Sequence, residues 1–140
     1  MIADGVAFVD TNVAVYAWDR SDPRRAVAAA LLPELLEAGR LRVSVQVLRE
    51  FFVTVTRKVK VPLSVDDALL ALEDLAAGGV QAEDEPMIRH AVTLQRDHRL
   101  SFWDALIVAA ALRAGARTLY TEDLDDGQVI EGLRVVNPFL

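Results

Sequence analysis

Apolar residues follow two alternating patterns along the chain, short runs typical of buried strands and longer stretches with helical spacing. We expect strands at residues 5–9, 41–45, 80–81, 118–120 and 133–136. The helical patterns cover residues 13–18, 23–38, 47–58, 65–77, 85–98 and 102–114. Strands that alternate with helices predict an α/β fold with a central, mostly parallel sheet covered by helices on both faces.

Local signals predict where several helices begin and end. Asp22 and Pro23 are expected to open the second helix, with Asp22 as its N-cap and Pro23 at its first position, and Gly39 is expected to end it. Ser64 and Ser101 each precede a helical stretch and carry an acidic residue three positions later, the pattern of a capping box.

The composition of the 140 residues favours one compact domain spanning residues 1–140. The chain is 53% hydrophobic and contains no cysteine, which excludes disulfides, thiolate zinc sites and cysteine nucleophiles. No signal-peptide pattern precedes the first strand, and the run Leu106–Leu112 is far shorter than the ~20 residues that a membrane-spanning helix needs. We therefore expect a cytoplasmic protein that does not act at a membrane.

Four acidic residues occupy corresponding places in the predicted fold. Each follows a strand directly or lies near the start of a helix: Asp10, Glu50, Asp104 and Asp123. Ligands of open α/β sheets bind beyond the carboxyl ends of the strands, where the strand order reverses. We therefore expect the four carboxylates to meet in one crevice.

Such a group of carboxylates requires neutralisation. Two carboxylates ~5 Å apart repel by about 3 kcal/mol at an effective dielectric constant of 20, and the six pairs among four approach ~20 kcal/mol. That exceeds the ~5–15 kcal/mol stability of a typical domain. The group must bind protons or hard cations, and oxygen ligands select Mg²⁺ or Mn²⁺. Carboxylate-held metal ions are a known device for phosphodiester cleavage. Bound cations would also reverse the local effect of the net charge of −6, which by itself disfavours nucleic acid.

Each acid also has a purely structural interpretation. Asp10 and Asn12 could only cap the short helix that follows them, and Asp104 could only complete a capping box with Ser101. Glu50 could be a solvated residue paired with Arg49 or Arg57, and Asp123 a turn residue. A capping acid can also bind metal, so these interpretations do not exclude a site.

The chain resembles the PIN domains of VapC-type toxins in motifs spread from end to end. The matching segments are Phe8–Val13 (FVDTNV), Leu48–Phe51 (LREF), Trp103–Ile107 (WDALI), Leu119–Leu124 (LYTEDL) with Gly127, and Val135–Phe139 (VVNPF). The resemblance implies a three-layer α/β/α sandwich and Mg²⁺- or Mn²⁺-dependent cleavage of RNA. It implies that Asp10, Glu50, Asp104 and Asp123 bind the metal. Asn12 and Thr121 are similar to the polar residues that support such a site. Glu122 stands beside Asp123, and the sequence does not decide which of the two is the fourth ligand.

The resemblance also implies partners and leaves other functions open. It implies a cognate antitoxin and a homodimer, in addition to the RNA substrate. Basic residues that could contact phosphates are Arg24, Arg25, Arg49, Arg57, Lys58, Lys60, Arg96, His98 and Arg99, although solvated helix faces explain them equally well. Trp18 and Trp103 are simplest as core or rim aromatics, with base stacking as the alternative. One alternative function is a non-catalytic module that binds a basic protein through the acidic groove. Another is a phosphoacceptor domain, but no lysine follows the late strand to hold the phosphate.

Overall fold

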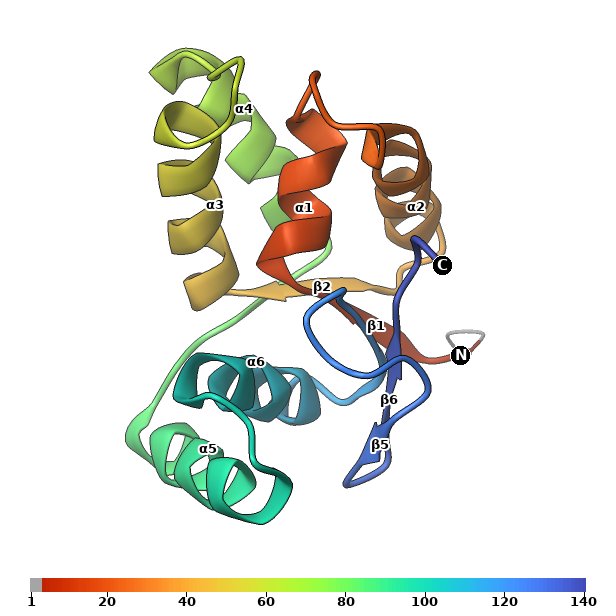
Figure 1. The fold of residues 1–140 in the computed structure, drawn as a ribbon, viewed down its shortest axis with the longest axis vertical. Helices are drawn as coiled ribbons and strands as arrows, with labels where there is room; N and C mark the ends of the chain where they lie inside the picture. Colours follow the sequence, from red (N-terminus) through yellow and green to blue (C-terminus); the bar gives the residue numbers. More distant parts are fainter. Residues whose placement is uncertain (1–3) are drawn as a thin grey trace.

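The computed structural model describes residues 4–140, and within them a six-stranded sheet lies between two layers of helices (Figure 1). The strands are β1 (Val6–Val9), β2 (Leu41–Ser44), β3 (Val80–Gln81), β4 (Ala116–Tyr120), β5 (Val129–Ile130) and β6 (Leu133–Val136). The helices are α1 (Thr11–Trp18), α2 (Arg25–Glu37), α3 (Val45–Arg57), α4 (Val65–Ala76), α5 (Glu85–His98) and α6 (Phe102–Arg113). The expectation that no signal peptide precedes the first strand rests partly on residues 1–3, which lie outside the described part.

The strand order places a topological switch point in the middle of the sheet. The order is β3-β2-β1-β4-β6-β5, and all neighbouring pairs are parallel except β5 and β6. The chain runs from β1 outward through β2 and β3, and then returns to place β4 on the other side of β1. Val9 is in register with Tyr120, so the residues that follow β1 and β4 emerge side by side. This is the edge where a ligand crevice is expected.

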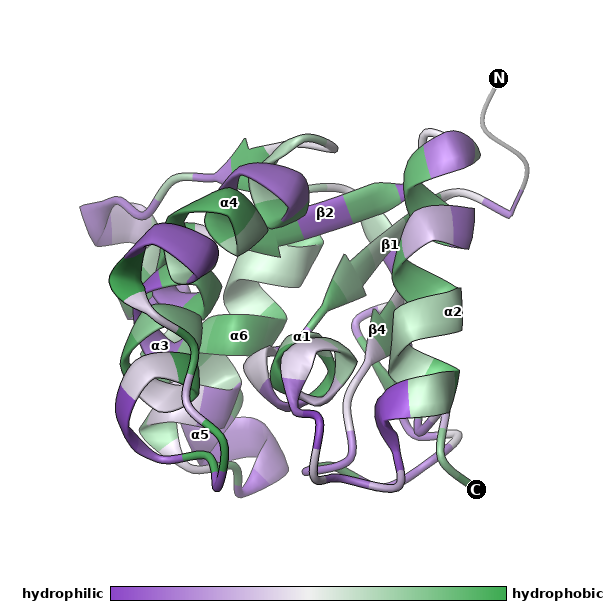
Figure 2. Ribbon diagram, turned by 90° about the horizontal axis from the view of Figure 1, so that it is seen from above, coloured by the Kyte–Doolittle hydropathy of each residue, from purple (hydrophilic) through white to green (hydrophobic). Residues whose placement is uncertain are grey.

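The two helical layers confirm the predicted three-layer fold. Helices α1 to α4 cover one face of the sheet, and α5 and α6 cover the other (Figure 1). Every residue from Ala105 to Ala111 of α6 is buried, because α6 packs between the sheet and α5. Figure 2 shows β1 and much of α6 as hydrophobic, while hydrophilic residues gather on the outer parts of α3, α4 and α5.

The expected caps are confirmed at two helices. The hydroxyl oxygen of Ser64 accepts a hydrogen bond from the backbone N–H of Asp67 at 3.1 Å, and Ser101 accepts one from Asp104 at 3.1 Å. Each hydroxyl satisfies a backbone donor that the first turn of a helix leaves without a partner.

The predicted start of α2 is wrong. The helix begins at Arg25, and Asp22 and Pro23 lie in the preceding turn. The Asp22 carboxylate accepts hydrogen bonds from the backbone N–H of Arg24 at 2.8 Å and from its guanidinium group at 2.8 and 2.9 Å. The side chain that was expected to cap the helix therefore closes an Asx turn around Arg24 instead.

Strand β5 was missed by the sequence analysis. It contains only two residues and pairs antiparallel with β6 across Glu131 and Gly132. Both connecting residues have positive φ, at 49° and 87°, as a type I′ hairpin turn requires.

Among residues 4–140, none of the helices combines the length and apolar character that crossing a bilayer requires.

The packing of α3 gives a stability prediction. Phe51 is fully buried, with its ring edge-on to Trp18 at a centroid distance of 5.3 Å, whereas the neighbouring Phe52 is only partly buried. We expect Phe51→Ala to lower the free energy of unfolding by about 3–5 kcal/mol, because it removes a buried ring and leaves a cavity. Urea unfolding of Phe51→Ala beside Phe52→Ala provides the measurement and its matched control. Equal losses in the two variants would contradict the assignment of Phe51 to the core.

Candidate active site

The first strand ends on a buried carboxylate. Asp10 follows β1, caps α1 and is only 5% exposed. Its Oδ1 accepts a hydrogen bond from the backbone N–H of Thr11 at 2.7 Å, and its Oδ2 accepts one from the hydroxyl of Thr121 at 2.8 Å. The capping interpretation of Asp10 is thus confirmed, and the same carboxylate lies at the switch point between β1 and β4.

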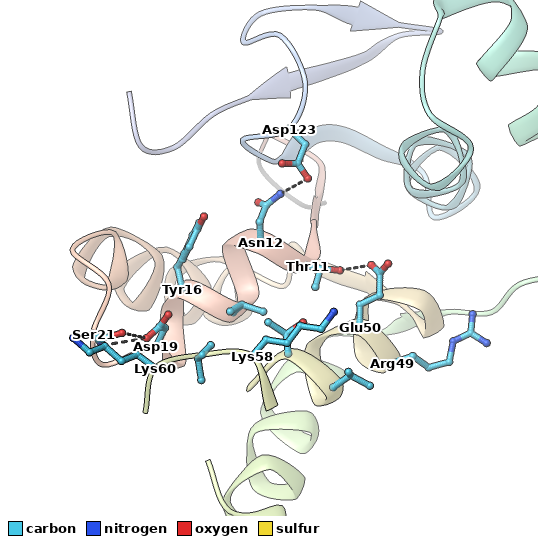
Figure 3. A pocket seen from close by; sticks show the side chains of 14 residues that line it. Thr11, Asn12, Tyr16, Asp19, Ser21, Arg49, Glu50, Lys58, Lys60 and Asp123 are labelled. Carbon is cyan, nitrogen blue, oxygen red and sulfur yellow. Dashed lines mark hydrogen bonds between the residues drawn. The ribbon is translucent and has the colours of Figure 1, made fainter. Parts of the chain in front are cut away.

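Thr121 connects the loop after β4 to this carboxylate. Its side chain is fully buried, and its hydroxyl oxygen accepts hydrogen bonds from Asn12 Nδ2 at 3.2 Å and from the backbone N–H of Asp123 at 3.1 Å. Asn12 Nδ2 also donates to Asp123 Oδ2 at 2.9 Å (Figure 3). The two polar residues that the resemblance singled out therefore hold Asp10 and Asp123 on one network.

Glu50 joins the same region from α3. The hydroxyl of Thr11 donates a hydrogen bond to Glu50 Oε1 at 2.8 Å, and Figure 3 shows this pair beside Asn12. Arg49, one of the expected partners of Glu50, instead pairs with Glu83 at 3.1 Å. Arg57, the other expected partner, forms no salt bridge in the described part of the chain. The interpretation of Glu50 as half of a surface ion pair is therefore wrong.

Asp104 comes from the opposite layer. It lies in the first turn of α6, where its backbone N–H donates a hydrogen bond to the Ser101 hydroxyl, and its side chain is half-buried. The side-chain amide of Gln46, in the first turn of α3, donates to the backbone carbonyl of Trp103 at 3.4 Å. This contact between the first turns of α3 and α6 places Asp104 near the helix that carries Glu50.

The pKa values of Asp10 and Asp104 show that the charges of other acids act on these two residues. Burial raises the pKa of Asp10 to about 7, although its hydrogen bonds with Thr121 and Thr11 lower it, and the charges of Asp123 and Asp104 raise it further. Burial also raises the pKa of Asp104, as do the charges of Asp123 and Glu50. We refer to Asp10, Glu50, Asp104 and Asp123 as the acid group.

The acid group suits a hard cation in its chemistry but does not form a closed set of ligands. Its donors are all carboxylate oxygens, as Mg²⁺ and Mn²⁺ prefer. Within residues 4–140, however, no three acidic or histidine side chains are arranged to hold a metal ion. Glu50 and Asp123 are instead held by Thr11 and Asn12. The residues therefore fit a divalent cation by donor type and by the need to neutralise Asp10.

The side chain of Glu122 points away from the acid group. The hydroxyl of Tyr16 donates to Glu122, and the Arg24 guanidinium forms an ion pair with it at 3.0 Å. Arg24 also lies over the ring of Tyr16, with its Cζ 3.9 Å from the ring centroid. The sequence analysis missed this arrangement, which we call the Tyr16–Arg24–Glu122 clamp. Of the two neighbouring acids, only Asp123 acts on Asp10 and Asp104.

A groove of about 840 Å³ runs from the acid group between α1 and α3 (Figure 3). Thr11, Asn12, Glu50 and Asp123 line it at the amino ends of these helices. Lys58 and Lys60 line it where α3 ends. We call this feature the α1–α3 groove.

Comparison with known proteins shows the family and the fold of this chain. The PIN domain model matches residues 7–129, and the chain therefore belongs to the PIN domain family. No curated protein sequence matches it.

Two solved structures share the fold. One is the VapC20 toxin of Mycobacterium tuberculosis, described as cleaving the sarcin–ricin loop, with a TM-score of 0.64, 21% identity, and coverage of 84% of this chain and 89% of that one. The other is from a toxin–antitoxin complex of Klebsiella pneumoniae, with a TM-score of 0.67, 23% identity, and coverage of 94% and 97%. The resemblance to PIN domains is confirmed, and the fold is that of VapC-type proteins.

The raised pKa of Asp10 predicts how stability depends on pH without metal. The folded state holds this proton more tightly than the unfolded state, whose pKa is near 3.8, so the free energy of unfolding falls as pH rises from about 4 to about 7. The contribution of Asp10 to this fall is about 4 kcal/mol. In EDTA, Asp10→Asn should flatten the slope of unfolding free energy against pH over this range. Parallel slopes in urea unfolding would show that Asp10 is ionised well below pH 7.

Proposed function

We propose that this PIN domain is a metal-dependent endoribonuclease and the toxin of a toxin–antitoxin pair. The main support is the acid group, which gathers from four separate elements at the switch point of the sheet. Its buried member, Asp10, has a pKa of about 7, so it carries a full charge at neutral pH only with a compensating cation. Carboxylates that hold a divalent cation are a known device for phosphodiester hydrolysis.

In this proposal the residues have distinct roles. Asp10, Glu50, Asp104 and Asp123 hold Mg²⁺ or Mn²⁺, which supplies Lewis acidity and neutralises the charge of the phosphodiester. Thr121 and Asn12 orient the carboxylates of Asp10 and Asp123 through the hydrogen bonds described above. Thr11 orients Glu50 in the same way. Such supporting hydrogen bonds fix the direction of ligand oxygens before the cation arrives.

A toxin of this kind would be restrained by an antitoxin. One of the similar structures comes from a toxin–antitoxin complex, and a basic side chain can replace a cation among carboxylates. An apolar groove of about 670 Å³ between α3 and α4, lined by Leu48, Phe52, Val53 and Leu72, supports binding of a protein partner. We propose that the protein acts in the cytoplasm as a homodimer, as the resemblance implies.

The first functional prediction concerns the acids nearest the interior. Purified protein should cleave single-stranded or loop-containing RNA with Mg²⁺ or Mn²⁺, and EDTA should abolish cleavage. Asp10→Asn and Asp104→Asn should each reduce the rate by more than about 100-fold, because loss of a direct ligand exceeds the 10–100-fold typical of supporting residues. Asp97→Asn is the matched control, since Asp97 pairs with Arg96 on α5. Cleavage that survives both substitutions, or persists in excess EDTA, would refute the proposal.

The second functional prediction separates the two neighbouring acids of the β4–β5 loop. Asp123→Asn should raise the Mn²⁺ concentration needed for half-maximal cleavage by more than about 100-fold, because the proposal makes Asp123 a direct ligand. Glu122→Gln should change it much less, because Glu122 is held by Tyr16 and Arg24. Titration of activity with Mn²⁺ for both variants provides the comparison. The reverse order of effects would make Glu122 the fourth ligand.

A further inference from the structure

Two lysines at the far end of the α1–α3 groove have no acidic partner. Lys58 and Lys60 line the groove, and neither forms a salt bridge within the described part of the chain. Most of the other Lys and Arg side chains also form no salt bridge within residues 4–140, so Lys58 and Lys60 are distinguished by their place in the groove. The Asp19 carboxylate lines the same end of the groove, where it accepts hydrogen bonds from the backbone N–H and hydroxyl of Ser21 and forms no salt bridge with either lysine. The two ammonium groups are therefore available to an anion that enters the groove.

Lys58 directly follows the helix that carries Glu50. Eight residues of helix separate Glu50 from Lys58, which corresponds to about 12 Å along α3. Figure 3 shows the Lys58 ammonium directed along the groove toward the Thr11–Glu50 pair, while Lys60 lies nearer Ser21. The two charges therefore extend the site from the acids along the groove.

An exposed aromatic ring neighbours one member of the acid group. Trp103 directly precedes Asp104 and is 62% exposed, which excludes a core role for its ring. Its ring contacts Phe102 edge-on at 5.2 Å, and Gln46 binds its backbone carbonyl. Trp103 is adjacent to Asp104 in the first turn of α6, so the exposed indole lies beside one member of the acid group.

We propose that a single RNA strand crosses the acid group, with backbone phosphates on Lys58 and Lys60 and an unpaired base stacked on Trp103. The inference rests on the proposed function and adds the path of the strand and the residues that bind its phosphates and one of its bases. A polyanion with flat bases matches unpaired cations in the groove and an exposed indole beside Asp104. A protein partner matches this combination less well.

The test measures binding separately from cleavage. A fluorescent single-stranded oligoribonucleotide is titrated by anisotropy, in EDTA and at several salt concentrations, with protein in an Asp10→Asn background so that the RNA stays intact. Adding Lys58→Ala and Lys60→Ala together should weaken binding and reduce the slope of log affinity against log salt by about 1.4, since each phosphate contact on a single strand contributes about 0.7. Arg57→Ala is the matched control, because Arg57 lies in the same segment outside the groove lining.

Trp103 gives an independent readout. Trp103→Ala should weaken binding by about 5- to 150-fold with no change in the salt slope, the range expected for loss of one stacked base. Trp103→Phe should retain most of the affinity, because a phenyl ring can still stack on a base. A duplex of the same sequence should bind more weakly than the single strand, and Trp103→Ala should change its affinity little, since paired bases are not free to stack on the ring.

Three outcomes would overturn the inference. The first is an unchanged salt slope in the double lysine variant, and the second is an equal effect of Arg57→Ala. The third is normal RNA binding by all variants together with weakened binding of a protein partner, which would assign the surface to that partner. If wild-type protein cleaves RNA while these variants bind like their parent, only the strand path is wrong. Absence of cleavage by wild-type protein with Mg²⁺ or Mn²⁺ would refute the nuclease proposal instead.

Discussion

The site depends on one buried carboxylate at the end of the central strand. Asp10 has two hydrogen-bond donors, Thr11 and Thr121, and both favour its charged form. Burial outweighs them, so the pKa rises to about 7. The fold thus places an acid where it is stable at neutral pH only after it gains a proton or a cation. A strand end with a neutral residue would be easier to bury, but it would leave the crevice without its inner anion.

The other carboxylates avoid the same cost by remaining accessible and by taking polar partners. Glu50 and Asp123 are exposed, and each accepts a hydrogen bond from a residue in the first turn of α1, Thr11 or Asn12. These hydrogen bonds hold Glu50 and Asp123 to α1, and within residues 4–140 the acids form no closed set of metal ligands. The first turn of α1 therefore supports three members of the acid group, since Asp10 caps that turn.

Much of this arrangement follows from sequence because its determinants are local. Asp10 and Asp104 are adjacent to a strand end and a helix cap, so periodicity and capping patterns place them correctly. The start of α2 was wrong because the Asp22 carboxylate binds Arg24, a choice that capping preferences do not describe. The direction of Glu122 depends on Arg24 and Tyr16, about 100 residues earlier in the chain, and no local pattern could reveal it. For the β5 hairpin, the local signal was Gly132, because glycine favours the positive φ that the hairpin turn requires.

Charges of both signs line the crevice of this acidic protein. Arg24 forms ion pairs with both Glu122 and Asp22, so the clamp holds Glu122 in place and offsets part of the negative charge of the two acids. Lys58 and Lys60 remain unpaired in the described part of the chain at the far end of the groove. In the proposed function, the acid group binds the cation and the two lysines bind phosphates farther along the strand. The local field, rather than the net charge of −6, decides which ligands approach the crevice.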